Sequence, residues 1–88
     1  MVRASDAATA NREAIALLRR GSLQEALAAF RAGIEQFPHE IALHQNFAQT
    51  LYETGDTPGA IEQHRRALQI DAASVASHFA LYELLQIT

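Results

Sequence analysis

The chain of 88 residues contains no cysteine, which excludes disulfide bonds, thiolate zinc sites and cysteine nucleophiles. It also lacks lysine: its seven basic residues are all arginines, and ten acidic residues bring the net charge to −3. A face that binds nucleic acid needs clustered positive charge to displace counterions from the phosphates. The composition therefore does not favour a nucleic-acid partner.

Long hydrophobic runs are absent as well. No stretch of the sequence reaches the roughly 18 consecutive apolar residues that a membrane-spanning helix requires. The first six residues have no apolar region of the kind that signal peptides carry. We therefore predict a cytoplasmic protein without a membrane partner.

Glycine and proline are scarce, with four and two residues, and three of the six interrupt a helical spacing of apolar residues that covers nearly the whole chain. Gly21 and Gly55 are expected to end helices, because glycine adopts the left-handed backbone conformation at little cost. Pro38 is expected at a junction between helices. The interruptions divide the chain into five predicted helices, the first over 7–19 and the last over 75–87.

Polar residues at the predicted helix starts are expected to act as caps. Ser22 and Glu25 have the spacing of a capping box, in which each side chain binds a free amide at the start of the helix. Asp56 is expected to cap the fourth helix, and either Asp71 or Ser74 the fifth.

Two segments of the chain repeat each other at a spacing of 34 residues. The identical pairs in this register include Ala14 and Ala48, Leu17 and Leu51, Gly21 and Gly55, and Ala26 and Ala60. A period of this size is typical of stacked helical repeats. We expect an N-terminal tail over residues 1–6, repeat one over 7–40, repeat two over 41–74, and a terminal helix over 75–88, either a cap or a truncated third repeat.

This pattern resembles the tetratricopeptide repeat over about residues 7–87. That family keeps small residues where helices cross, a large apolar residue in the wedge between repeats, and a proline near the junction. Repeat two departs from it with His64 at the large apolar position and Ala72 at the proline position. The resemblance implies an all-α fold, a right-handed superhelical solenoid of five antiparallel helices. Repeat one matches the family pattern at Ala14, Ala26, Phe30, Gly33 and Pro38.

The resemblance also implies a concave groove that holds an extended or helical peptide of a partner protein. Several groove positions carry asparagine or glutamine, whose amides can pair with the donors and acceptors of a peptide backbone. The resemblance thus predicts a non-catalytic module for protein–protein interaction. Carried over position by position, the groove residues are Asn11, Ile15, Arg19, Gln45, Gln49, Tyr52, Glu53, Phe79 and Glu83, with Asn46 beside them.

One subfamily function is not expected. Repeat domains that bind the acidic C-terminus of heat-shock chaperones use a clamp of Lys, Asn, Asn, Lys and Arg. Without those cations, a terminal carboxylate loses its main attraction. The matching positions here carry Asn11, Ile15, Asn46, Ala76 and Ala80, of which only Asn46 agrees.

The predicted terminal helix is apolar on more than one face. We expect Leu81, Tyr82 and Leu85 to form a self-association surface, because large exposed apolar patches mark interfaces. The sequence leaves two explanations open: the segment belongs to a longer array, or the helix docks on a second copy as a homo-oligomer. A further alternative is that the repeats belong to a longer multidomain enzyme, for instance a transferase, whose activity lies outside these residues.

No combination of residues predicts catalysis. The nearest metal pattern is His39-Glu40 followed by His44, but zinc proteases need their two histidines four residues apart. The separation of five residues turns the second imidazole by about 140° around a helix. His44 and His78 are equivalent in the register, and we expect each to fill space between helices with one ring nitrogen hydrogen-bonded. The prediction is therefore no catalytic site, no metal and no cofactor.

Overall fold

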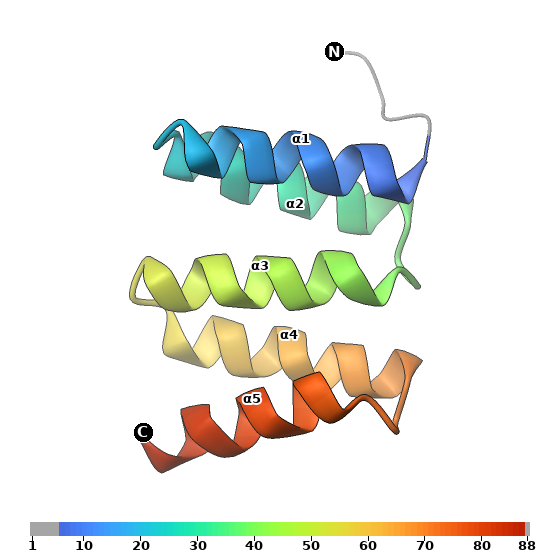
Figure 1. Ribbon diagram of the computed structural model, residues 1–88, viewed down its shortest axis with the longest axis vertical. Helices are drawn as coiled ribbons and strands as arrows, with labels where there is room; N and C mark the ends of the chain where they lie inside the picture. The colour runs from blue at the N-terminus through green and yellow to red at the C-terminus, as the bar shows by residue number, and fades with distance from the viewer. Residues whose placement is uncertain (1–5, 88) are drawn as a thin grey trace.

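The computed structural model describes residues 6–87, so the predicted tail lies outside the described residues except for its last residue. Figure 1 shows the helices stacked in chain order, each antiparallel to the one before it. The predicted all-α fold of five antiparallel helices is confirmed. The helices are α1 (Ala7–Arg19), α2 (Leu23–Gln36), α3 (Ile41–Glu53), α4 (Thr57–Ile70) and α5 (Val75–Gln86).

The turns inside the two repeats have the same geometry. Gly21 and Gly55 have φ angles of +80° and +94°, in the left-handed region that side chains disfavour. In each turn the amide of the next residue donates to a carbonyl in the last turn of the preceding helix, that of Leu17 at 3.0 Å and that of Leu51 at 2.8 Å. The prediction that these glycines end helices is therefore confirmed.

The predicted capping box at Ser22 is wrong, whereas the predicted cap at Asp56 is confirmed. The two residues have nearly the same backbone angles, with φ −85° and ψ 67° at Ser22 and φ −94° and ψ 73° at Asp56. Asp56 accepts a hydrogen bond from the Gly59 amide at 2.9 Å, but Ser22 makes no cap hydrogen bond with its side chain. The aspartate side chain is one bond longer than that of serine. With this backbone conformation, its carboxylate therefore reaches the amide at the start of the helix, whereas the serine hydroxyl does not.

The caps of the first and last helices are also defined. Ser74 caps α5 by accepting from the Ser77 amide at 3.3 Å, which decides between the two predicted candidates. Asp6, which the sequence reasoning did not single out, caps α1 by accepting from the Thr9 amide at 2.7 Å. This hydrogen bond from the Thr9 backbone lowers the pKa of the Asp6 carboxyl, because it stabilises the charged form.

Small residues are buried where the helices cross. A Cβ atom at Gly33 would lie 3.3 Å from a methyl carbon of Leu43 and 3.4 Å from Cβ of Ala10, so glycine lets α1, α2 and α3 approach closely. The alanines without exposed surface at the predicted small positions are Ala14, Ala26, Ala48, Ala60 and Ala67.

Aromatic rings fill the joint between the two repeats. Phe30 on α2 is fully buried, and its ring stacks on that of Phe47 on α3 with centroids 6.0 Å apart and an interplanar angle of 26°. The Arg31 guanidinium lies 5.4 Å from the Phe47 centroid, within the range of a cation–π contact. None of the described helices is both long and apolar enough to cross a membrane.

Candidate functional site

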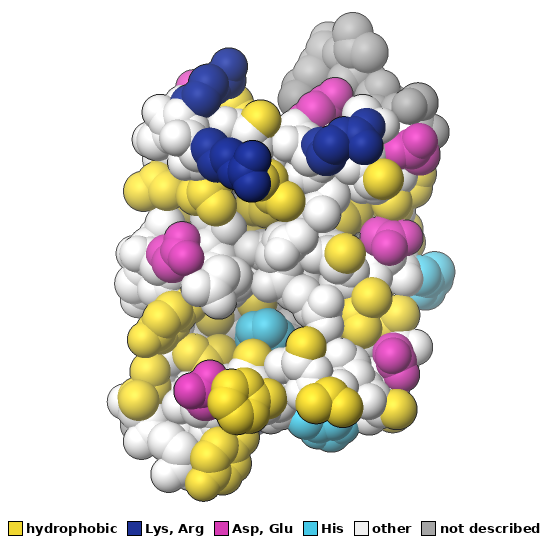
Figure 2. Space-filling view, in the orientation of Figure 1, with side chains coloured by type: hydrophobic (Ala, Val, Ile, Leu, Met, Phe, Trp, Pro, Cys, Tyr) yellow, Lys and Arg dark blue, Asp and Glu magenta, His cyan; other side chains and the backbone are white. Residues whose placement is uncertain are grey.

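A cavity of about 570 Å³ lies between α3 and α5, with its floor on α4. Figure 2 shows the molecular surface hollowed below α3, with a histidine side chain visible inside the hollow. The volume falls within the range of about 300–1,000 Å³ that is usual for ligand sites. The lining residues are Ala48, Gln49 and Tyr52 of α3, His64 of α4, and Ala80, Tyr82, Glu83, Leu84, Gln86 and Ile87 of α5 and its C-cap.

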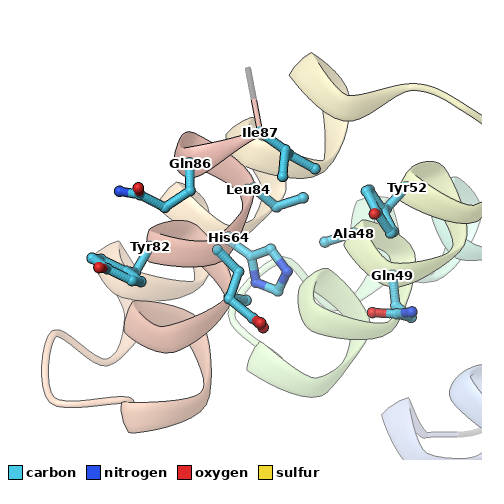
Figure 3. A pocket seen from close by; sticks show the side chains of 10 residues that line it. Ala48, Gln49, Tyr52, His64, Tyr82, Leu84, Gln86 and Ile87 are labelled. Atoms are coloured by element: carbon cyan, nitrogen blue, oxygen red, sulfur yellow. The ribbon is translucent and has the colours of Figure 1, made fainter.

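The histidine at the floor of this cavity is His64, whose side chain is only 7% exposed. Its Nδ1 atom is buried and has no hydrogen-bond partner among the described residues. Burial lowers the pKa of the imidazole, because desolvation disfavours the charged form. Figure 3 shows the ring close to Leu84 of α5 and Ala48 of α3. The cavity is therefore lined by a largely buried imidazole whose unpaired Nδ1 is itself shielded from solvent.

The cavity lining also includes polar and acidic side chains. Gln49 donates a hydrogen bond to Glu53 at 3.0 Å, which holds both side chains along α3. Glu83 lines the cavity from α5, and no arginine is among the lining residues. Tyr82 lies on the side of α5 away from His64 in Figure 3, so it contributes to the outer edge of the cavity.

The cavity brings together three of the ten predicted groove residues, namely Gln49, Tyr52 and Glu83. Two other predicted positions, Asn11 and Asn46, bind each other across α1 and α3, with the Asn46 amide donating to the Asn11 carbonyl oxygen at 2.8 Å. The remaining predicted residues lie outside the cavity lining. They are Ile15 and Arg19 on α1, Gln45 and Glu53 on α3, and Phe79 on α5.

Gln45 connects α3 to the start of α5. Its amide donates to the Ser77 hydroxyl at 2.9 Å and to the Ser74 hydroxyl at 3.1 Å. The Ser77 side chain is fully buried, so these hydrogen bonds satisfy polar groups that are shielded from water. Gln45 therefore has a structural role, while peptide binding by this residue stays a prediction.

His44 makes more hydrogen bonds than the sequence predicts. Its Nδ1 lies 2.9 Å from Oε1 of Gln63 and its Nε2 lies 2.9 Å from the carbonyl oxygen of Pro38, so the prediction of a single bonded nitrogen is wrong for this ring. His78 has one bonded ring nitrogen, as predicted, with Nε2 at 2.7 Å from the carbonyl oxygen of Ala72, but the residue is exposed, so the prediction that it fills space between helices is wrong. The two carbonyls are equivalent in the 34-residue register. Each histidine therefore hydrogen-bonds to the backbone of the junction that precedes its own helix.

Metal-ligating side chains are dispersed in the described part of the chain. Within residues 6–87, no group of three His, Asp or Glu side chains is placed to hold a metal ion. His39 lies exposed at the junction before α3, while both ring nitrogens of His44 are already engaged.

The outer face of α5 carries exposed apolar side chains. Val75 is 80% exposed and Tyr82 65%, and Leu85 is about half exposed. The equivalent residues of α3, 34 positions earlier, lie on the side that α4 covers. Ile41 is half-buried there, and Ala48 and Leu51 are buried. Leu81 differs from the other two predicted self-association residues, because it is half-buried at the register position of the buried Phe47.

Sequence reasoning missed the residue at the floor of the cavity as a site residue. The signal was present, since His64 departs from the large apolar residue that the repeat pattern has at this position. A smaller polar side chain at a wedge position leaves space unless neighbouring residues grow to fill it. The neighbours here include Ala48 and Ala80, which are small.

Comparison with known families agrees with this architecture. The family model described as the tetratricopeptide repeat matches residues 17–85, most of the chain. A search of curated proteins returned no match. Modules of the matched family generally mediate protein–protein interaction and are typically non-catalytic. The register, the turn glycines, the buried small residues and the family match lead to one conclusion: the chain belongs to the tetratricopeptide repeat family.

Proposed function

We propose that the chain binds a peptide segment of a partner protein, extended or helical, in the concave groove along α1, α3 and α5. The observation that carries this proposal is the cavity of about 570 Å³ between α3 and α5. Its lining combines apolar walls with a few polar groups, the composition that is usual for sites that bind ligands selectively.

The amide pair on α1 and α3 supports the proposal. The hydrogen bond of 2.8 Å between Asn46 and Asn11 fixes both side chains. It leaves the amide group of Asn11 and the carbonyl oxygen of Asn46 for the donors and acceptors of a peptide backbone. Because the two groups are already ordered, a peptide that binds them loses less side-chain entropy on association.

Selection of peptides from a random displayed library tests the proposal. We expect enriched peptides to bind the wild-type chain and to lose at least about tenfold in affinity for Gln49→Arg, because a long charged side chain there obstructs the cavity. Gln69→Arg is the matched control, since it makes the same change at an exposed position of α4 outside this cavity. Equal binding by both variants, or no enriched peptide, would count against a groove function.

Self-association through α5 is the second candidate function. Its support is the exposed face of α5 that carries Val75, Tyr82 and Leu85. In repeat two, α4 covers the equivalent face of α3. We expect sedimentation velocity to detect a dimer that Tyr82→Arg dissociates, since an apolar interface does not tolerate a desolvated charge. A monodisperse monomer at every accessible concentration would contradict this candidate.

Three broader expectations stay predictions. They are the cytoplasmic location, the absence of nucleic-acid and membrane partners, and the alternative that these repeats serve a longer enzyme such as a transferase. The full reading frame tests the last of them, because a catalytic domain joined to residues 1–88 would support the alternative.

A further inference from the structure

We propose that the partner segment carries an acidic side chain where it crosses α1 and a basic side chain where it crosses α3 and α5, so that it binds the groove in one direction. The proposal rests on the proposed function and adds the charges by which the groove selects its partner. Its basis is the separation of charge along the groove, with arginines on α1 and carboxylates on α3 and α5.

The basic end of the groove is formed by Arg12 and Arg19 of α1, which are both exposed. Arg19 is one of the groove positions that the register gives, and Arg12 lies at the register position of Asn46. The Asp6 carboxylate attracts Arg12 and balances part of its charge. Arg19 forms no ion pair with any residue between 6 and 87, so its charge is available to a partner.

The acidic residue of α1 lies on another side of the helix. Glu13 has the register position of Phe47, which faces the preceding repeat across the first joint. Glu13 therefore faces the end of the helix stack and not the groove. Figure 2 views the face that contains the cavity, and the arginine side chains visible on it all lie at the level of α1, with none over α3 or α5.

The acidic end of the groove is formed by Glu53 of α3 and Glu83 of α5, which are both exposed. Gln49 donates to the Glu53 carboxylate at 3.0 Å and holds it along α3, and Glu83 lines the cavity. Neither α3 nor α5 contains an arginine. Glu53 stands 34 residues after Arg19, so the charge at this groove position changes sign between α1 and α3.

This arrangement discriminates between partner segments by their charge. A segment with one acidic and one basic residue is attracted at both ends of the groove in one orientation and repelled at both ends in the other. A uniformly acidic or uniformly basic segment is attracted at one end and repelled at the other. Each exposed pair contributes little by itself, so the charges add specificity and direction more than affinity.

The distance between the two ends predicts the spacing of the charges in the partner. Figure 1 shows α3 between α1 and α5, and helices that pack lie about 8–10 Å apart, so the two ends are separated by about 20 Å. An extended segment covers this distance in about six residues. A helical segment lying along the groove needs about 13 residues. The spacing therefore also reports whether the bound segment is extended or helical.

The test uses peptides that the wild-type chain selects from a random displayed library. We expect the enriched peptides to share an acidic and a basic residue at one of these two spacings. Changing the acidic residue to lysine should weaken binding to the wild type about fivefold at low salt. Arg19→Glu should restore the binding of the changed peptide, whereas the matched control Arg65→Glu should not, since it makes the same change at an exposed position of α4.

The outcomes separate this inference from the proposed function. Groove-binding peptides without paired charges, or with equal affinity at about 50 mM and about 500 mM sodium chloride, overturn the inference and leave the proposed function standing. Both comparisons use the wild type alone, so they hold even if a variant folds poorly. If no peptide binds the groove, the proposed function fails and the inference fails with it.

Discussion

The joint between repeats one and two differs from the joint between repeat two and α5, although the same register builds both. At the first joint Phe30 and Phe47 stack with centroids 6.0 Å apart. The equivalent positions of the second joint hold His64 and Leu81, and the cavity lies beside them. The first joint is closed by aromatic packing, whereas the second is open and has a polar floor.

A second exchange accompanies this difference. Gly33 leaves room for the fully buried Leu43 at the first joint, since a Cβ there would lie 3.3 Å from the leucine methyl carbon. The equivalent pair at the second joint is Ala67 on α4 and Ser77 on α5, so α4 gains a methyl group and α5 has a small polar side chain in place of leucine. The pair at the second joint is smaller and more polar, and Ser77 accepts a hydrogen bond from Gln45 at 2.9 Å.

The comparison teaches which positions hold the repeat together and which are free to change. The turn glycines and the alanines at helix crossings are alike in both repeats, because close approach of backbones admits few alternatives. The wedge position between repeats has more freedom, since it holds Phe30 at one joint and His64 at the other. We therefore attribute the fold to the shared positions and the proposed function to the wedge.

The largest expected effect comes from emptying the closed joint. Phe30→Ala should lower the free energy of unfolding by about 3–5 kcal/mol, because it removes a fully buried ring and leaves a void. His64→Ala should lower it by only about 1 kcal/mol, since the truncation also removes an unpaired nitrogen beside existing space. Urea denaturation of the two variants measures both quantities. Equal losses would mean that the second joint is packed as tightly as the first.

The next effect examines the positions that both repeats share. Gly21→Ala and Gly55→Ala should each lower the free energy of unfolding by about 1–2 kcal/mol, because a side chain disfavours the left-handed conformation. A Cβ atom at either position meets nothing within 4 Å, so backbone strain is the only penalty and the two losses should agree. Thermal unfolding followed by circular dichroism compares them. Losses that differ clearly would show that the two turns are not equivalent.

A smaller effect distinguishes the two cap positions. Asp56→Ala should lower the free energy of unfolding by about 1 kcal/mol, because it removes the hydrogen bond of 2.9 Å to the Gly59 amide. Ser22→Ala should have almost no effect, since the Ser22 side chain makes no cap hydrogen bond. Urea denaturation again gives both values. A loss at Ser22 as large as that at Asp56 would restore the capping box that the structure does not contain.

Much of the fold was predictable because its determinants are local or periodic. Gly21 and Gly55 mark the turns by a backbone requirement that one residue type meets best, and the 34-residue register then assigns the buried alanines. The failure at Ser22 has a physical reason. Whether a hydroxyl reaches the amide depends on a backbone angle that the turn sets, and the sequence pattern does not specify that angle.

The candidate site was less predictable than the fold. Its lining joins residues of three helices, and the space at His64 exists only because Ala48 and Ala80, distant in sequence, are small. The family pattern located Gln49, Tyr52 and Glu83 because groove positions follow the register. It did not predict that Asn11 and Asn46 bind each other, since side-chain pairing across helices depends on the distance between them.

The smallest expected effect is the pH dependence that the open joint gives to the whole fold. Burial lowers the pKa of His64 in the folded chain below the ordinary value of 6.5. At pH values between the two pKa values of His64, the unfolded chain binds more protons than the folded chain. Stability is therefore unaffected by this titration above pH 6.5 and falls as the pH is lowered from there toward the pKa of His64 in the folded chain. We expect the wild type to lose stability on this acidification relative to His64→Phe, which has no titrating group at the joint.

The measurement is urea denaturation of the wild type and His64→Phe at a series of pH values on both sides of 6.5, taken as the difference between the two proteins. The difference cancels the titration of the carboxylates that both proteins share. His78→Phe serves as the control and should keep the wild-type pH dependence, because His64 is intact in it. The closed joint has Phe30 at this position and therefore no titrating group. A stability difference between wild type and His64→Phe that stays constant with pH would mean that His64 is not held neutral. The two joints would then differ in packing alone.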